Sequence, residues 1–170
     1  MMKRVFLLLG LAVLVCASAS AQAPRRVSQD SSARPDLRGV YARWLSEDVS
    51  YIITPVERRA FTLLKSDAER EQFVEAFWLR RDPRPDTATN EYRDEHYARL
   101  AHANQSFAAG DTLGWRTDRG RTYITLGKPD EVLKTSTGEV WVYRHAPGFG
   151  SNVEIKFVDA NGTGDLRLQP

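Results

Sequence analysis

Cysteine is almost absent from this chain, which has a single one, Cys16, among 170 residues. One cysteine cannot form a disulfide bond within the chain or a cysteine-ligated zinc site. If Cys16 is removed during export, the mature chain also lacks any thiolate nucleophile. We therefore expect a domain that is stabilised by its hydrophobic core alone.

The sequence also lacks an apolar run of the roughly 18 to 20 residues that span a bilayer. Its apolar run Val5–Val15 follows the basic residues Lys3 and Arg4 and precedes the small residues Ala17–Ala21. This order is typical of a secretory signal peptide. We expect cleavage near residue 21 and a periplasmic or extracellular protein. Two alternatives stay open: retention of the run as a membrane anchor, and lipidation at Cys16.

An excess of charge is missing as well. The formal net charge is +2, and removal of Lys3 and Arg4 leaves a mature chain close to neutral. A nucleic-acid-binding protein usually has a basic face. Charge and export together argue against nucleic acid as a partner.

Familiar catalytic motifs are missing too. The sequence contains no Gly-x-Ser-x-Gly elbow, no His-Glu-x-x-His pair and no phosphate-binding Walker loop. We assign no catalytic residue, no metal ligand and no cofactor.

The first half of the mature chain has helical patterns. Residues 22–38 are rich in Ser, Pro and Arg and predict a flexible linker, followed by a domain over residues 39–170. Two capping boxes, Thr54–Glu57 and Ser66–Glu69, predict helices to about residue 65 and residue 81. A third helix is expected from just after Thr87 or Thr89 to residue 108. Before these helices, a helical turn near residues 41–45 and an extended piece at 49–53 are expected.

The second half alternates with period two. Thr122–Leu126, Glu139–Arg144, residues 153–157 and residues 166–168 predict strands joined by short turns. Short connections favour an antiparallel meander. The predicted fold class is therefore α+β, with about three N-terminal helices packed on one face of a small C-terminal antiparallel sheet.

The junction between the halves carries a distinctive pattern, Gly-Trp-Arg-Thr-Asp-Arg-Gly-Arg, which runs into an apolar stretch that ends in Gly-Lys-Pro-Asp. It resembles the signature of the GWxTD-domain family of exported bacterial proteins. Residues 77–85, 89–91, 157–159 and 162–165 are similar to further blocks of that family, so the resemblance extends from about Trp44 to Leu168. It implies an exported α+β domain but no particular activity. The signature positions are Gly114, Trp115, Thr117, Asp118, Gly120, Gly127, Pro129 and Asp130.

Two interpretations of the polar signature residues stay open. In the first, Thr117–Gly120 forms a tight turn, Gly120 adopts a positive φ, and nearby arginines pair with carboxylates to hold the helices on the sheet. In the second, guanidinium groups bind a small acidic ligand such as a carboxylate or phosphate. The candidate ligand-binding residues are Arg80, Arg81, Arg119 and Arg121.

Other candidate sites are weaker. Glu91, Glu95 and His102 share one face of the third predicted helix, which is a possible cation site, but Glu95 is also placed to pair with Arg99. His96 lies on the apolar face, where we expect a structural histidine. The four tryptophans are expected in the core rather than on a sugar-binding platform.

Together these patterns predict an exported, non-catalytic interaction domain. Its partner is expected to be another envelope or extracellular protein, which would bind at the bare sheet face or at the loop around Phe149. The alternatives are an enzyme that acts on an envelope polymer and an arginine-lined binder of a small acidic ligand. The sequence does not indicate an oligomeric state.

Overall fold

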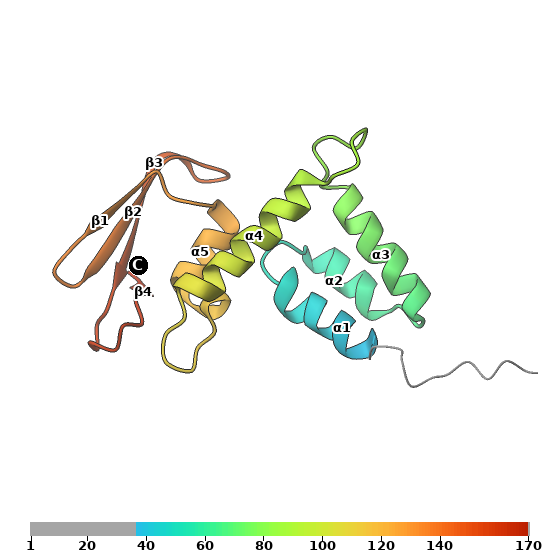
Figure 1. The fold of residues 1–170 in the computed structure, drawn as a ribbon, viewed down its shortest axis with the longest axis horizontal. Coiled ribbons are helices and arrows are strands. Elements are labelled where there is room, and N and C mark those ends of the chain that lie inside the picture. Colours follow the sequence, from blue (N-terminus) through green and yellow to red (C-terminus); the bar gives the residue numbers. More distant parts are fainter. Residues whose placement is uncertain (1–36, 170) are drawn as a thin grey trace, which may run out of the picture. The chain divides into compact units, whose positions relative to one another are not determined.

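The computed structural model describes residues 37–169, so the predicted signal peptide and most of the predicted linker lie outside the described residues. Within this range, five α-helices precede a four-stranded antiparallel sheet (Figure 1). The predicted α+β class is confirmed, but the helix count is five rather than three. The helices are α1 (Leu37–Arg43), α2 (Pro55–Thr62), α3 (Asp67–Leu79), α4 (Glu91–Ser106) and α5 (Asp118–Leu126).

The two predicted capping boxes are both present. Backbone N–H groups of Glu57 and Glu69 donate to the hydroxyls of Thr54 and Ser66, and each glutamate accepts from the backbone N–H of its cap. Asn90 caps α4 by accepting a hydrogen bond of 2.9 Å from a backbone amide in the first turn. The two capping boxes depend on residues three positions apart, and so the sequence predicts them well. The cap of α4 was expected at Thr87 or Thr89 and lies at Asn90 instead.

The first three helices pack around Trp44, which belongs to a π-helical turn, η2 (Trp44–Asp48). Phe61 from α2 and Phe77 from α3 contact its indole, with ring centroids 5.0 and 5.2 Å away. The expected extended piece at residues 49–53 was wrong. Residues 49–52 form turns in which the N–H of Ile53 bonds to the carbonyl of Val49, because this buries both side chains beside Trp44.

The predicted strand at Thr122–Leu126 was also wrong, because these residues are the second half of α5. In the helix, Ile124 packs against α4, and Tyr123 and Leu126 pack against the sheet. An alternating strand would direct Ile124 and Leu126 to the same side. Tertiary packing therefore decides this segment against its strand-like composition.

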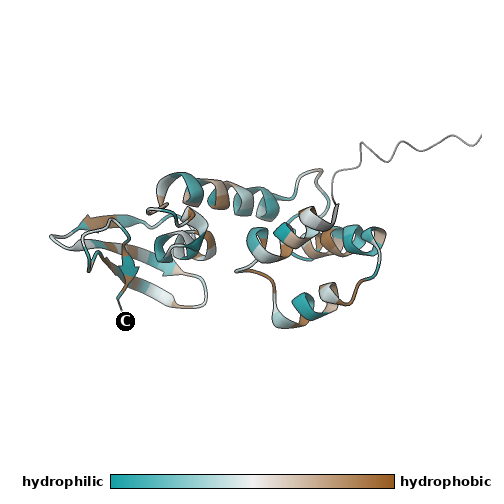
Figure 2. Cartoon of the chain, turned by 90° about the horizontal axis from the view of Figure 1, so that it is seen from below, coloured by the Kyte–Doolittle hydropathy of each residue, from teal (hydrophilic) through white to brown (hydrophobic). Residues whose placement is uncertain are grey.

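The sheet has the order β1-β2-β3-β4, with β1 (Glu131–Lys134), β2 (Gly138–Ala146), β3 (Gly150–Val158) and β4 (Arg167–Leu168). Its strands carry both hydrophobic and hydrophilic residues (Figure 2). Trp141 of β2 lies opposite Val132 of β1 and Ile155 of β3. Because opposite residues share a face, these side chains lie on the side of the sheet that α5 covers.

Only the later helices pack against the sheet cluster in the described part of the chain. Phe107, Tyr123 and Leu126 contact the cluster that contains Trp141, whereas α1 to α3 contribute to the separate cluster around Trp44. The prediction that three N-terminal helices cover one face of the sheet is therefore corrected. None of the helices in residues 37–169 is long and apolar enough to span a membrane.

Candidate functional site

Helix α5 lies on the sheet and leaves a concavity on each side. A nine-residue helix is only about 13 Å long, so it cannot cover the helix-facing side of four strands. One concavity, of about 600 Å³, lies between the α4–α5 pair and the β1–β2 hairpin. The other, of about 690 Å³, lies between α5 and the β3–β4 side. We call them the polar concavity and the apolar groove.

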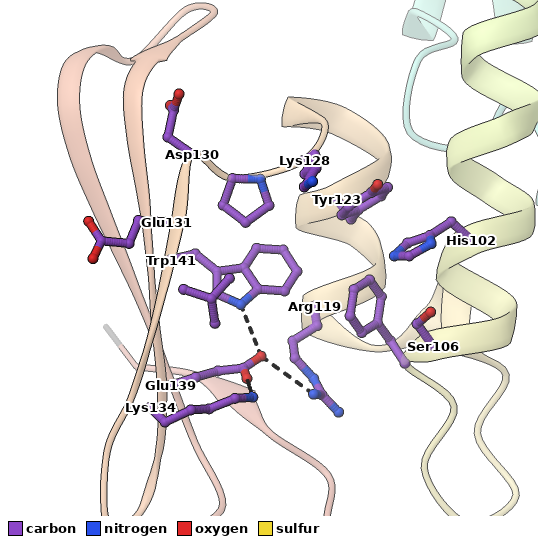
Figure 3. Close-up of a pocket in the computed structure, with 13 residues that line it drawn as sticks. His102, Ser106, Arg119, Tyr123, Lys128, Asp130, Glu131, Lys134, Glu139 and Trp141 are labelled. Atoms are coloured by element: carbon purple, nitrogen blue, oxygen red, sulfur yellow. Dashed lines mark hydrogen bonds and ion pairs between the residues drawn. The ribbon is translucent and has the colours of Figure 1, made fainter.

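The polar concavity has aromatic walls (Figure 3). His102 of α4 stacks on Tyr123 of α5, with ring centroids 4.4 Å apart. Phe107 meets the rings of Tyr123 and Trp141 at 5.6 and 5.4 Å. The walls therefore come from α4, α5 and β2, which are distant in sequence.

Glu139 is the polar centre of this concavity, and it is only 3% exposed. Its Oε1 accepts hydrogen bonds from Trp141 Nε1 at 2.9 Å and from Arg119 Nη1 at 3.4 Å, and its Oε2 accepts one from Lys134 Nζ (Figure 3). Burial opposes ionisation of Glu139, but the hydrogen bonds from Lys134 and Trp141 and the charges of Lys134 and Arg119 outweigh burial and hold its pKa below the usual value. The site therefore holds a carboxylate between two cations.

Glu139 and Lys134 are not among the residues predicted to form a site, although the sequence contains a signal for them. Glu139 lies two and four residues before Trp141 and Tyr143 in β2, so the three side chains point to the same face of the sheet. A charged residue therefore faces the covered side. A buried charge requires partners. The hairpin places Lys134 directly opposite Glu139, and α5 supplies Arg119.

The first half of the signature forms a compact backbone contact. A 3-10 turn, η3 (Gly114–Arg116), lies against α4, and a Cβ on Gly114 would stand 1.9 Å from the carbonyl oxygen of Ala103. A Cβ on Gly120 would stand 1.8 Å from the carbonyl oxygen of Gly114. The expected positive φ of Gly120 was wrong, because Gly120 lies inside α5. This glycine is needed for close approach of two backbones.

Thr117, Trp115 and Asp118 complete this contact. The buried hydroxyl of Thr117 donates to the Gly114 carbonyl at 2.8 Å and accepts from the Gly120 N–H at 3.1 Å, which caps α5. Trp115 is 6% exposed and its backbone N–H donates to Asn104 of α4. Asp118 accepts from the backbone N–H of Leu168, which ties α5 to β4. In the structure these signature residues join α4, α5 and the sheet.

The second half of the signature makes the turn from α5 into β1. Gly127 has a φ of +85° and its carbonyl accepts a hydrogen bond of 3.0 Å from the Tyr143 hydroxyl. Pro129 is buried and lines the polar concavity. Asp130 accepts from the backbone N–H of Arg144 at 2.7 Å. These three residues fix the hairpin to the end of α5.

The four arginines proposed as ligand-binding residues each have a carboxylate partner. Arg80 and Arg81 both bind Glu57, at 3.1 and 2.7 Å. Arg119 pairs with Glu139, and Arg121 pairs with Asp118 at 2.9 Å. The structure therefore brings together two arginines at Glu57, and it places only Arg119 in the polar concavity. Hydrogen bonds from Arg81, Thr54 and Arg80 to the Glu57 carboxylate lower the pKa of Glu57 to about 2.

The residues of the possible cation site have separate contacts. Glu91 bonds to Arg84, Glu95 bonds to Arg99 at 2.7 Å, and His102 stacks on Tyr123. Among residues 37–169, no group of three or more His, Cys, Asp or Glu side chains is arranged to hold a metal ion.

His96 is the most buried polar residue of α4. It is 4% exposed, and its Nε2 lies 2.6 Å from the Asp48 carbonyl, so Nε2 carries the proton. Burial lowers its pKa. The neutral ring joins α4 to the η2 turn, as a structural histidine does.

The apolar groove contains Phe149, the residue singled out in the sequence as a possible contact. Phe149 is the last residue of the turn between β2 and β3 and is 73% exposed. Leu168 of β4, also on the groove, is 50% exposed. The remaining apolar lining consists of Tyr51, Leu126, Val153 and Ile155.

The fold and the signature contacts define an α+β domain built around the Gly114–Asp130 segment. The family model of the GWxTD domain matches residues 15–165. The chain therefore belongs to the GWxTD-domain family. No curated protein and no solved structure matches it.

Proposed function

We propose that this GWxTD protein is an exported, non-catalytic interaction domain that binds another envelope or extracellular protein at the apolar groove. The observation that carries the proposal is the 73% exposure of Phe149 beside a groove of about 690 Å³. Export is proposed from the basic residues, the apolar run and the small residues of positions 1–21.

The chemistry of the groove suits a protein partner. Burial of a Phe side chain contributes about 1.5 to 3 kcal/mol, and interfaces often have aromatic anchors inside a polar rim. Leu168, Val153 and Ile155 supply the apolar floor, and the charged residues Arg121, Glu154 and Lys156 also line the groove. A partner that inserts an apolar side chain here would remove both the floor and Phe149 from water.

Binding without catalysis is supported by the contacts in the polar concavity. The carboxylate of Glu139 is bonded to Lys134, Trp141 and Arg119, and its pKa is lowered, so it stays ionised at neutral pH. His102 stacks on Tyr123. These groups stabilise one another, and general acid catalysis would need a carboxyl group that keeps its proton.

The test is an affinity pull-down from solubilised envelope and culture supernatant, with mass spectrometry of the retained proteins. Phe149→Ser should abolish retention of the partner and leave the melting temperature unchanged, because the side chain is exposed. Val56→Ser is the matched control, since Val56 is 71% exposed on α2. A partner retained equally by both variants would contradict the proposed surface.

Binding of a small acidic ligand in the polar concavity is a second candidate. Lys134 and Arg119 both pair with Glu139 there, and Lys128, Asp130 and Glu131 also line the concavity. The buried Nε of Arg119 has no hydrogen-bond partner in the described part of the chain. Titration with phosphate and with benzoate, followed by tryptophan fluorescence, tests this idea. Saturable binding that is lost in Arg119→Gln would support it, and no saturable change would exclude these ligands.

A further inference from the structure

Strand β1 forms one edge of the sheet, and all four of its residues are exposed. Val132 is 42% exposed and Leu133 is 45% exposed. An exposed edge strand is a template for pairing with another strand, and charged side chains commonly protect such edges. Strand β1 carries two charged residues, Glu131 and Lys134, and the ammonium group of Lys134 donates to Glu139 of β2.

The register of β1 shows which backbone groups face outward. Thr135 N–H donates to the Gly138 carbonyl at 2.9 Å, and Leu133 lies opposite Val140 two residues further along. Hydrogen-bonded and non-hydrogen-bonded pairs alternate in an antiparallel ladder. The backbone N–H and C=O groups of Leu133 therefore point toward β2, whereas those of Val132 and Lys134 point away from it. Among residues 37–169, these outward groups have no partner.

The outward N–H and C=O groups of β1 can pair with the same groups of a second copy of the chain. A two-fold axis perpendicular to the sheet at Leu133 would place Val132 of one copy opposite Lys134 of the other, and the reverse. Each such pair exchanges two N–H···O=C bonds, so all four outward groups of each copy are satisfied. We infer that two copies of this chain pair through antiparallel β1 strands in this register, which joins their sheets into one. This inference uses a different surface from the proposed function and is independent of it.

The side chains fit the same register. Leu133 lies on the face opposite Trp141, and it meets Leu133 of the second copy directly on the axis. Val132, on the helix-facing side, meets the aliphatic stem of Lys134, and Glu131 lies opposite the uncharged Thr135. No like charges stand opposite each other, and cross-strand apolar pairs stabilise a sheet.

The pairing also changes the polar concavity. A two-fold axis perpendicular to the sheet keeps the helices of both copies on one side. Val132 and Lys134 line the β1 side of the concavity. The same residues of the second copy therefore extend this wall, and the two polar concavities lie on either side of the axis.

Cysteine cross-linking tests the register in the full chain with Cys16→Ser as background. Residues of a non-hydrogen-bonded antiparallel pair have Cα atoms about 4.5 Å apart, within the range of a disulfide. Leu133→Cys should therefore give at least about tenfold more disulfide-linked dimer under mild oxidation than Leu113→Cys, a control at a 53% exposed position. Val132→Cys should stay near the control, because it lies opposite Lys134.

Sedimentation equilibrium tests the pairing without cross-linking. The average mass of the Cys16→Ser chain should rise with concentration, and Leu133→Lys should abolish this rise because two lysines would meet on the axis. A monomer at all concentrations, together with no excess cross-linking at Leu133→Cys, would overturn the inference. So would a dimer that Leu133→Lys leaves unchanged, or cross-linking at Val132→Cys alone. An unchanged circular dichroism spectrum checks that each variant is folded.

Discussion

Gly120 lies so close to Gly114 that a Cβ on Gly120 would stand 1.8 Å from the Gly114 carbonyl oxygen. The two glycines belong to α5 and to the η3 turn, and Gly114 in turn lies against α4. Two glycines of the family signature therefore let three backbone segments approach each other closely. Whether alanine at position 120 stabilises or destabilises the fold therefore tests this close contact.

Gly120→Ala should lower the free energy of unfolding by about 3 kcal/mol, because the new methyl group has to separate α5 from the η3 turn. Without this contact, alanine would instead stabilise a helix by about 1 kcal/mol relative to glycine. Urea unfolding measures the difference. Gly162→Ala is the control, since Gly162 has a φ of +66° but open space around it, and it should cost only about 1 kcal/mol. A stabilised Gly120→Ala variant would contradict the close packing.

Thr117→Ala should destabilise the protein by about 2 kcal/mol, because it removes the cap of α5 and leaves the Gly114 carbonyl without the Thr117 hydroxyl. Thr117→Ser keeps the hydroxyl and loses one buried methyl group, so its cost should be about 1 kcal/mol. Thermal unfolding of the pair separates the two effects. Equal losses in both variants would mean that the hydroxyl contributes nothing.

Trp115→Ala should cost about 3 to 5 kcal/mol. The indole is 6% exposed, packs with Leu100, Ala103 and Ile124, and meets the ring of Tyr51 at 6.0 Å. Chemical denaturation measures the loss. The neighbouring Leu113, which is 53% exposed, serves as control, because Leu113→Ala should have little effect. An unchanged midpoint for Trp115→Ala would refute its role as an anchor between α4 and α5.

Glu57→Gln should remove a pH-dependent part of the stability. The pKa of Glu57 is lowered to about 2 in the folded chain, against about 4.3 in an unfolded one. A lowered pKa stabilises the fold above the unfolded value, and this contribution disappears as the pH falls through the folded value. The variant should therefore be less stable by about 2 kcal/mol at pH 7, and the difference should shrink from about pH 4.5 towards pH 2.

Unfolding of both proteins in urea across this pH range measures the linkage. Glu71→Gln on α3 is the control, because Glu71 is exposed and makes no ion pair within residues 37–169. A constant difference between Glu57→Gln and the parent chain from pH 7 to pH 2.5 would show that Arg80 and Arg81 do not act on the charge of Glu57.

The sequence predicted the secondary structure correctly where residues close in the chain decide it. The boxes at Thr54 and Ser66 began their helices as predicted, because a cap and its partner lie three residues apart. The period-two pattern around Trp141 gave a strand between two others. The signature identified the family correctly and placed the junction of helices and sheet.

By itself, then, the sequence determined the α+β class, the starts of α2 and α3, the central strand and the family. Tertiary structure decided α5, because a nine-residue helix has little stability alone and the pattern of Ile124 and Leu126 suits a strand equally well. The helix forms because Gly120 fits against Gly114 while Ile124 and Tyr123 reach different clusters. The Glu139 site likewise needs Arg119 from α5, twenty residues away. Such contacts depend on how distant segments pack, which local patterns do not record.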